Sequence, residues 1–178
     1  MSKKLKAFMP MHQRAVVREW GEETKLDVLI PLEKQIEAIP KSQGETHTNQ
    51  TIVYAHFFYA ESDWFITEWV DENRLFGYTI LNGDSVMSEW GYLSLDELTG
   101  NGRVELDFHW KPKYLPEAQY KADPNYFKKP TKVYKPKKKK SAEDKAKKLK
   151  LAKAKAAAQQ QRIRILEIEK LSVSGLTG

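Results

Sequence analysis

Three acidic side chains have the residue types and spacing for acid–base or metal chemistry. Glu68 lies in one aromatic-rich run, and Glu105 and Asp107 lie two residues apart in a second run. Side chains at i and i+2 of a strand share a face, and convergent carboxylates bind divalent metals or share a proton. Any solvated strand face shows the same alternation. These three residues are therefore catalytic candidates, but the sequence favours a protein without enzymatic activity over an enzyme.

Other catalytic and ligand residues give no recognisable pattern. The four histidines, at positions 12, 47, 56 and 109, lack metal-ligand spacing, and the chain has no cysteine. The sequence contains no phosphate-binding glycine loop, no G-x-S-x-G element and no dinucleotide fingerprint. We therefore expect neither a bound metal nor a cofactor.

A lysine-rich segment is the strongest charge feature of the chain. Residues 128–155 hold 14 lysines, two acidic residues and no arginine. Lysines neutralise nucleic-acid phosphates, and without interleaved aromatic residues they read few bases. The alternatives are a solubilising tail or a tail that folds over the acidic body. The nucleic-acid-binding candidates are Lys128, Lys129, Lys132, Lys135, Lys137, Lys138, Lys139, Lys140, Lys145, Lys147, Lys148 and Lys150.

The remainder of the chain is acidic. Residues 1–120 carry 12 Lys and Arg against 19 Asp and Glu, whereas residues 121–178 carry 18 against 5. This asymmetry is typical of an acidic folded body with a basic tail. An acidic, aromatic-rich surface attracts basic proteins and can imitate a phosphate backbone. Candidate protein-binding residues are Trp64, Glu68, Trp90, Tyr92 and Asp96, together with Ile163 and Leu166 in the tail.

The elements that position these residues follow from turn chemistry. Four β-rich runs, at 51–59, 64–70, 75–81 and 86–93, are separated by polar turns, including Asn82-Gly83 and residues 61–63. They predict an antiparallel meander. Ser94 and Glu97 form a capping box that starts a short helix. A fifth strand follows at 104–108 and stops before Pro112. Gly91, between two aromatic residues, suggests a bulge or a close backbone approach.

Helices are expected before the sheet and near the end of the chain. Leu32, Ile36 and Ile39 have helical spacing that stops at Pro40, residues 15–20 suggest a helical turn or two, and residues 26–30 suggest a short strand. The expected fold is therefore α+β: a five-stranded antiparallel meander with short covering helices, a basic linker and a C-terminal helix. The expected segments are an acidic domain (1–120), a Pro/Lys-rich linker (121–140), a basic helix (141–172) and a disordered end (173–178).

Several of these runs resemble a known protein family. Val53-Tyr54-Ala55-His56-Phe57-Phe58 and Glu89-Trp90-Gly91-Tyr92-Leu93-Ser94-Leu95-Asp96-Glu97-Leu98 are similar to a bacterial, phage and plasmid domain-of-unknown-function family whose signature is G-Y-F-S-L-D-E-L. The resemblance covers about residues 32–112. The chain departs from the family in having His56 where lysine is frequent and Leu106 where arginine is frequent. The resemblance implies a mobile-element setting and supplies no activity.

The sequence therefore suggests a non-enzymatic accessory protein of a phage or mobile element. It would bind nucleic acid non-specifically through its tail and another protein through its acidic domain. One alternative is an inhibitor of a host defence or other nucleic-acid-binding protein by acidic charge mimicry, and another is a carboxylate- or metal-dependent nuclease-like enzyme. No run of about 18 apolar residues is present, so we expect a cytoplasmic protein of a bacterial host with no membrane partner.

Overall fold

The computed structural model describes residues 1–42 and 48–135. The compact unit that contains them runs from Met1 to Pro136. The helix and end expected at 141–178 lie outside the described residues, as do the tail candidates from Lys137 onward. The helices are α1 (Lys3–Phe8), α2 (Met11–Glu19), α3 (Glu22–Glu37), α4 (Leu95–Gly100) and α5 (Leu115–Ala122). The strands are β1 (Ile52–Val53), β2 (Ala55–Tyr59), β3 (Ser62–Trp69), β4 (Arg74–Leu81), β5 (Asp84–Ser94), β6 (Glu105–Leu106) and β7 (Lys113–Tyr114).

The fold is α+β, built on a five-stranded antiparallel sheet with the strand order β5-β4-β3-β2-β6. The predicted meander is confirmed. Asn82 and Gly83 both adopt positive φ in the β4–β5 turn, as an Asn-Gly turn requires. The β2–β3 turn differs from the prediction, which placed it at residues 61–63. Strand β3 already begins at Ser62, and Ala60 takes the positive φ.

Two strands are shorter than expected. The run 51–59 is interrupted at Tyr54, so β1 pairs with β7 while β2 belongs to the main sheet. The fifth strand contains only Glu105 and Leu106. Phe108 lies beyond it, where its ring makes an edge-to-face contact with Trp20. Alternation alone therefore overestimated the length of both strands.

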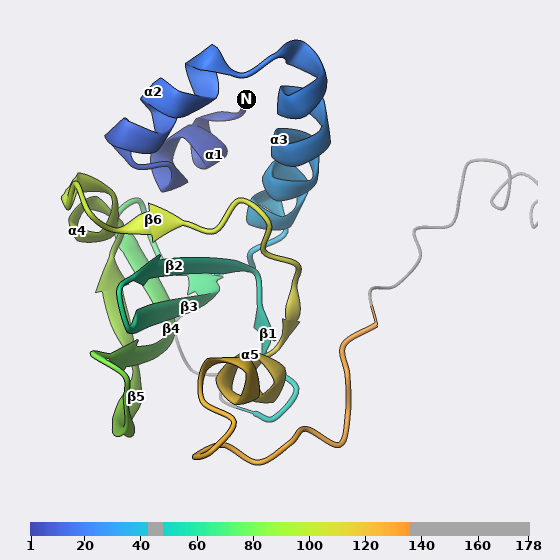
Figure 1. The fold of residues 1–178 in the computed structure, drawn as a ribbon, viewed down its shortest axis with the longest axis vertical. Coiled ribbons are helices and arrows are strands. Elements are labelled where there is room, and N and C mark those ends of the chain that lie inside the picture. Colours follow the sequence, from blue (N-terminus) through green and yellow to red (C-terminus); the bar gives the residue numbers. More distant parts are fainter. Residues whose placement is uncertain (43–47, 136–178) are drawn as a thin grey trace, which may run out of the picture. The chain divides into compact units, whose positions relative to one another are not determined.

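One face of the sheet is covered by the N-terminal helices (Figure 1). Phe8 of α1 packs against Phe57 and Trp69, with ring centroids 5.8 and 5.1 Å apart. The strand expected at 26–30 is wrong, because those residues lie inside α3, where Leu29 packs into the same core. The predicted end of that helix before Pro40 is confirmed.

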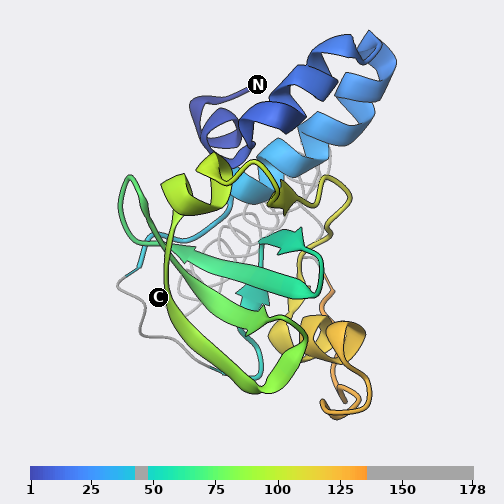
Figure 2. The same ribbon diagram turned by 60° about the vertical axis from the view of Figure 1, so that its left-hand side comes forward.

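The opposite face is covered by α5, which packs with Val53, Phe65 and Tyr78 in a second core. Figure 2 shows the twisted sheet between the N-terminal helices and α5. At the end of β5, the Ser94 hydroxyl accepts a hydrogen bond from the Glu97 amide, so the Ser94 half of the predicted capping box is confirmed. No helix among the described residues has the length and apolarity needed to cross a membrane.

Two glycines face each other across β4 and β5 in different environments. A Cβ added at Gly91 would meet nothing within 4 Å, whereas a Cβ at Gly77 would collide with the Phe65 carbonyl oxygen. The expected special role of Gly91 is therefore wrong. The close backbone approach occurs at its partner Gly77, where β4 lies against β3.

Candidate functional site

The basic segment after α5 is attached to the body at its start. Asp123 accepts hydrogen bonds from the amides of Asn125 and Tyr126, and the Ser85 hydroxyl donates to its other carboxylate oxygen at 2.8 Å. The bond from Ser85 is the main reason that the pKa of Asp123 is lowered. This turn therefore fixes the beginning of the segment to β5.

Aromatic rings and a second carboxylate fix the remainder of the segment. Phe127 makes edge-to-face contacts with Tyr78 and Tyr126, and Tyr134 makes one with Tyr114, with centroids 5.3 Å apart. The Tyr134 amide also donates to Glu117 Oε1 at 2.6 Å. The expected boundary after Tyr120 thus falls inside α5, and residues 123–135 pack on the body although they form no helix or strand.

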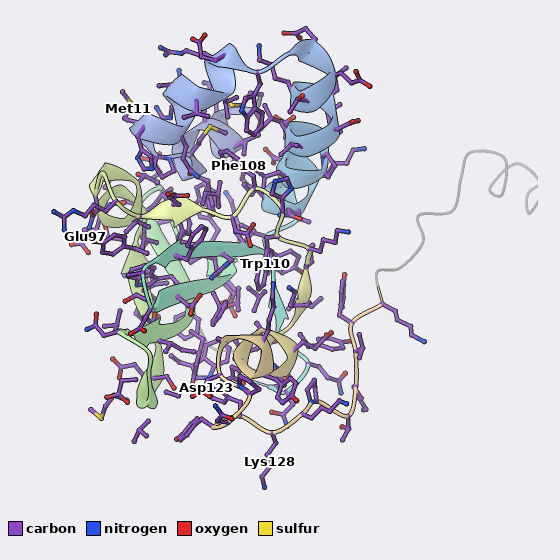
Figure 3. The ribbon with its side chains drawn as sticks, in the orientation of Figure 1. Met11, Glu97, Phe108, Trp110, Asp123 and Lys128 are labelled. Atoms are coloured by element: carbon purple, nitrogen blue, oxygen red, sulfur yellow. The ribbon has the colours of Figure 1, made fainter. Side chains whose placement is uncertain are left out.

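The lysines of this segment are accessible to solvent. Lys128, Lys129, Lys132 and Lys135 are all exposed, and Figure 3 shows Lys128 extending away from the body. Within the described part of the chain, none of these four forms an ion pair. The fold therefore presents four unneutralised ammonium groups within eight residues.

A buried histidine cluster lies on the α5 face of the sheet. His56 Nε2 is 2.6 Å from Asp63 Oδ1, and its Nδ1 is 3.4 Å from Asp107 Oδ2. The His56 ring packs on Phe65 and Trp110, and only 12% of its side chain is exposed. The cluster joins β2, β3 and the turn after β6.

The electrostatics of this cluster favour a charged histidine. Burial lowers the pKa of His56, but the hydrogen bonds and charges of Asp107 and Asp63 outweigh burial and raise it overall. Burial likewise raises the pKa of Asp107, but hydrogen bonds from His56 and from the His109 amide lower it overall. Both ring nitrogens of His56 therefore face a carboxylate, an arrangement that favours the imidazolium form.

The cation nearest this cluster is itself constrained. Lys113 Nζ lies 3.8 Å from the centroid of the Trp110 ring, a cation–π contact. Burial, followed by the charge of Lys121, lowers the pKa of Lys113, while Asp107 and Glu117 oppose the shift.

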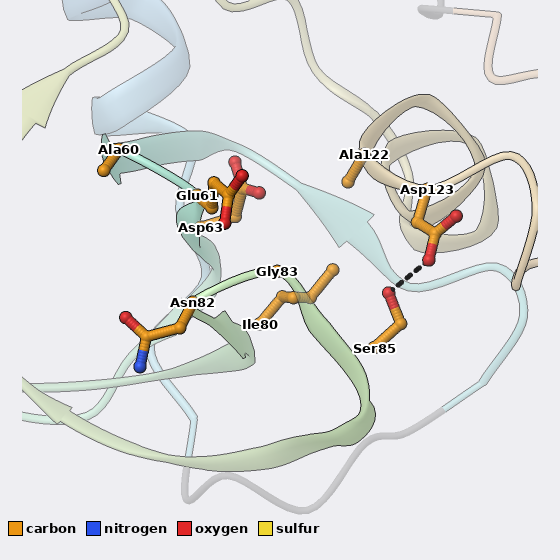
Figure 4. Close-up of a pocket in the computed structure, with 9 residues that line it drawn as sticks. All are labelled: Ala60, Glu61, Asp63, Ile80, Asn82, Gly83, Ser85, Ala122 and Asp123. Carbon is orange, nitrogen blue, oxygen red and sulfur yellow. Dashed lines mark hydrogen bonds between the residues drawn. The ribbon is translucent and has the colours of Figure 1, made fainter.

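An acidic cavity of about 390 Å³ lies on the other side of Asp123 (Figure 4). Its lining includes Glu61, Asp63 and Asp123, and Asp123 is bonded to Ser85. Within residues 1–42 and 48–135, no group of three His, Asp or Glu side chains has the arrangement of a metal site.

The three carboxylates singled out by the sequence are not brought into one site. Asp107 bonds to His56, Glu105 is exposed on β6, and Glu68 is 4% exposed and accepts a hydrogen bond from the Ser42 hydroxyl. Glu68, Glu105 and Asp107 therefore lie in three different environments, one buried, one exposed and one bonded to a histidine. Burial also removes Glu68 from any protein-binding surface.

The other protein-binding candidates lie along β3, β5 and α4. Tyr92 is 56% exposed and stacks with Arg74, Asp96 is exposed, and Trp64 and Trp90 are half-buried. Trp90 stacks on Phe76 with an interplanar angle of 9°. Ile163 and Leu166 lie outside the described residues.

Sequence reasoning missed His56 and Asp63 as partners. His56 and Asp63 are seven residues apart across the β2–β3 turn. The register of a hairpin at that turn makes them diagonal neighbours on adjacent strands, so their contact could have been predicted from the sequence. The third member, Asp107, follows β6, the strand that pairs with β2, and is 51 positions from His56 in the chain. No local pattern marks that pairing.

Comparisons of the chain with known protein families, with curated proteins and with solved structures gave no match.

Proposed function

We propose that the protein is a non-enzymatic accessory protein that binds nucleic acid without sequence preference through its lysine-rich C-terminal part. The observation that carries the proposal is the run of exposed lysines at 128, 129, 132 and 135, which form no ion pair with another described residue and whose segment is attached to the body at both ends. The printed sequence continues this charge with ten further lysines up to residue 155. The mobile-element setting, in a bacterial cytoplasm, rests on the family resemblance.

Phosphate neutralisation explains why such a segment binds nucleic acid. Each lysine that contacts a phosphate releases a condensed counterion, so log affinity falls with log salt by about 0.9 per contact on duplex DNA. If about six lysines contact the duplex at once, the expected slope is about −5. Lysine ammonium groups carry no base-specific hydrogen-bond pattern, so affinities for unrelated sequences should agree closely.

A charge-matched pair of variants tests this proposal. We expect replacement of Lys128, Lys129, Lys132 and Lys135 by glutamine to flatten the salt slope by about 3 to 4 units, measured by fluorescence anisotropy of a labelled duplex. The control replaces Lys3, Lys6, Lys34 and Lys111 by glutamine. These lysines are also exposed, so the control removes the same charge from another part of the surface. An equal effect of both quartets, or no binding by the full chain at low salt, would refute the proposal.

The second part of the proposal is that the acidic body binds another protein. Residues 51–110 contain 11 acidic and 2 basic side chains, and many of the acids are exposed, including Asp71, Glu72, Asp96 and Glu97. This charge steers basic partners and repels phosphates. We expect nuclease-resistant, stoichiometric capture of a partner that is lost when these four acids become amides. Capture that depends on nucleic acid would contradict this part.

A further inference from the structure

A cavity with an unusual lining lies beside the lysine segment. It encloses about 560 Å³ between the turn before β1, one side of α5 and the segment that follows α5. That volume falls within the range of small-ligand sites, about 300–1,000 Å³. The lining residues are Asn49, Gln50, Pro116, Gln119, Phe127, Lys128, Lys129, Pro130, Thr131 and Lys132.

The lining combines three kinds of chemical group. Its cations are three lysines, and no carboxylate is among those lining residues that the structure describes. Three carboxamides, on Asn49, Gln50 and Gln119, each offer both donors and an acceptor. Phe127 and two prolines give an apolar wall. These groups match three parts of a nucleotide. The lysines match its phosphate, the carboxamides match the edge of its base, and the apolar wall matches the face of its base.

The cavity wall is held in place before any ligand arrives. Phe127 is fixed by ring contacts to Tyr78 and Tyr126, and its amide donates to the Asp123 carbonyl at 3.0 Å. Beyond the lysines, the Tyr134 amide is bonded to Glu117 of α5. A preorganised wall reduces the ordering cost of binding.

The acidic cavity limits where the phosphates of a bound strand can lie. It lies on the other side of Asp123 and is lined by Glu61, Asp63 and Asp123, which repel a phosphate chain. A strand that follows the lysines is therefore directed toward the cavity beside Gln119 and away from β5.

We propose that this cavity binds one unpaired nucleotide of a nucleic-acid strand, with the base among the carboxamides and the apolar wall and the phosphates on the lysines. The inference rests on the proposed nucleic-acid binding and specifies it. A base in a duplex is stacked and paired, so the site selects single strands over duplexes.

The test compares strands and two variants of α5 in the full chain. Gln119→Leu removes a carboxamide that lines the cavity, and the control Ala122→Leu alters the same helix where it faces the acidic cavity. By anisotropy at fixed salt, we expect wild type to bind a 12-nucleotide single strand at least about fivefold tighter than a 12-base-pair duplex. Gln119→Leu should weaken single-strand binding about tenfold, equivalent to about 1.4 kcal/mol, and leave duplex binding and the salt slope unchanged.

Competition identifies the ligand class. A mononucleotide at millimolar concentration should displace the single strand, and inorganic phosphate should not. Equal affinity for strand and duplex, equal effects of Gln119→Leu and Ala122→Leu, or equal displacement by phosphate would overturn the inference. Each of these results leaves the lysine-dependent salt slope intact, whereas loss of all binding would refute the proposed function as well. Thermal melts of both variants confirm that the chains are folded.

Discussion

The charge on His56 should make the stability of the fold depend on pH. Only an imidazolium donates hydrogen bonds from both ring nitrogens, and both nitrogens of His56 face carboxylates. Because the pKa of His56 is raised in the folded state, its contribution to stability is fully present below about pH 6.5, the usual histidine pKa, and is lost as pH rises through the raised value. The pKa of Asp107 is lowered in the folded state, so its contribution to stability has the opposite pH dependence. That contribution is lost only as the solution becomes strongly acidic.

The size of this effect follows from the two bonds. A hydrogen bond to a charged group contributes about 1.5–3 kcal/mol, against about 0.5–1.5 kcal/mol for a neutral one. Neutral His56 keeps one donor, and the longer 3.4 Å bond to Asp107 counts for less than the 2.6 Å bond to Asp63. Both carboxylates are 25% exposed, which lets solvent screen part of the charge. We expect a loss of about 2 kcal/mol between pH 6 and pH 9.

Urea unfolding followed by tryptophan fluorescence measures this loss. His56→Gln keeps a hydrogen-bonding side chain without a titrating ring, so its deficit relative to wild type should be large at pH 6 and about 2 kcal/mol smaller at pH 9. His12→Gln, at a half-buried position on α2, is the control. A deficit for His56→Gln that is equal at both pH values would show that His56 stabilises the fold by packing alone.

Four further experiments test the fold by substitution or truncation. Gly77→Ala should cost about 3 kcal/mol in chemical unfolding because its Cβ meets the Phe65 carbonyl, whereas Gly91→Ala, directly opposite, should change stability by less than about 0.5 kcal/mol; equal costs would contradict the packing described. Gln13→Leu should cost about 2–4 kcal/mol because it leaves the Leu106 amide and carbonyl without their partner, whereas Gln35→Leu should be nearly neutral, since the buried Gln35 Nε2 has no partner among the described residues. Ser94→Ala should lower the free energy of unfolding by about 1 kcal/mol through loss of the α4 cap, and an unchanged unfolding curve would show that the cap is dispensable. A chain that ends at Lys135 should unfold cooperatively, whereas one that ends at Tyr120 should be clearly less stable because it loses the contacts of Phe127 and Tyr134; equal melts would place the boundary back at Tyr120.

The sheet was predictable because its strands are consecutive and their turns carry local signals. Asn82-Gly83 and the Ser94 cap act within a few residues, so sequence reasoning found them. Residues 26–30 are mostly Leu, Val and Ile and were expected to form a short strand, yet they lie in α3, where Leu29 packs into the core. Tertiary packing overrides local propensity at such positions.

The candidate sites were less predictable because they join distant segments. The lysines were evident from composition, but the cavity requires Gln50, Gln119 and Phe127 to meet, which depends on the docking of α5. The His56 cluster requires β6 to pair with β2 across the intervening hairpins. Neither arrangement has a signature within a short stretch of sequence.

The Gln13 side chain links the first part of the chain to strand β6, and this contact constrains the order of folding. Its amide group donates to the Leu106 carbonyl and accepts from the Leu106 amide, so it acts as one residue of an additional strand, although 93 positions separate the two residues. At about 5–20 residues per second, a ribosome needs roughly 5–20 seconds to synthesise the intervening chain. Throughout that interval α1 and α2 have no completed sheet to cover, and their apolar residues Leu5 and Phe8 are available to chaperones. The bond between Gln13 and Leu106 therefore forms only after β6 has been translated, so α2 reaches its final position later than the hairpins of the sheet.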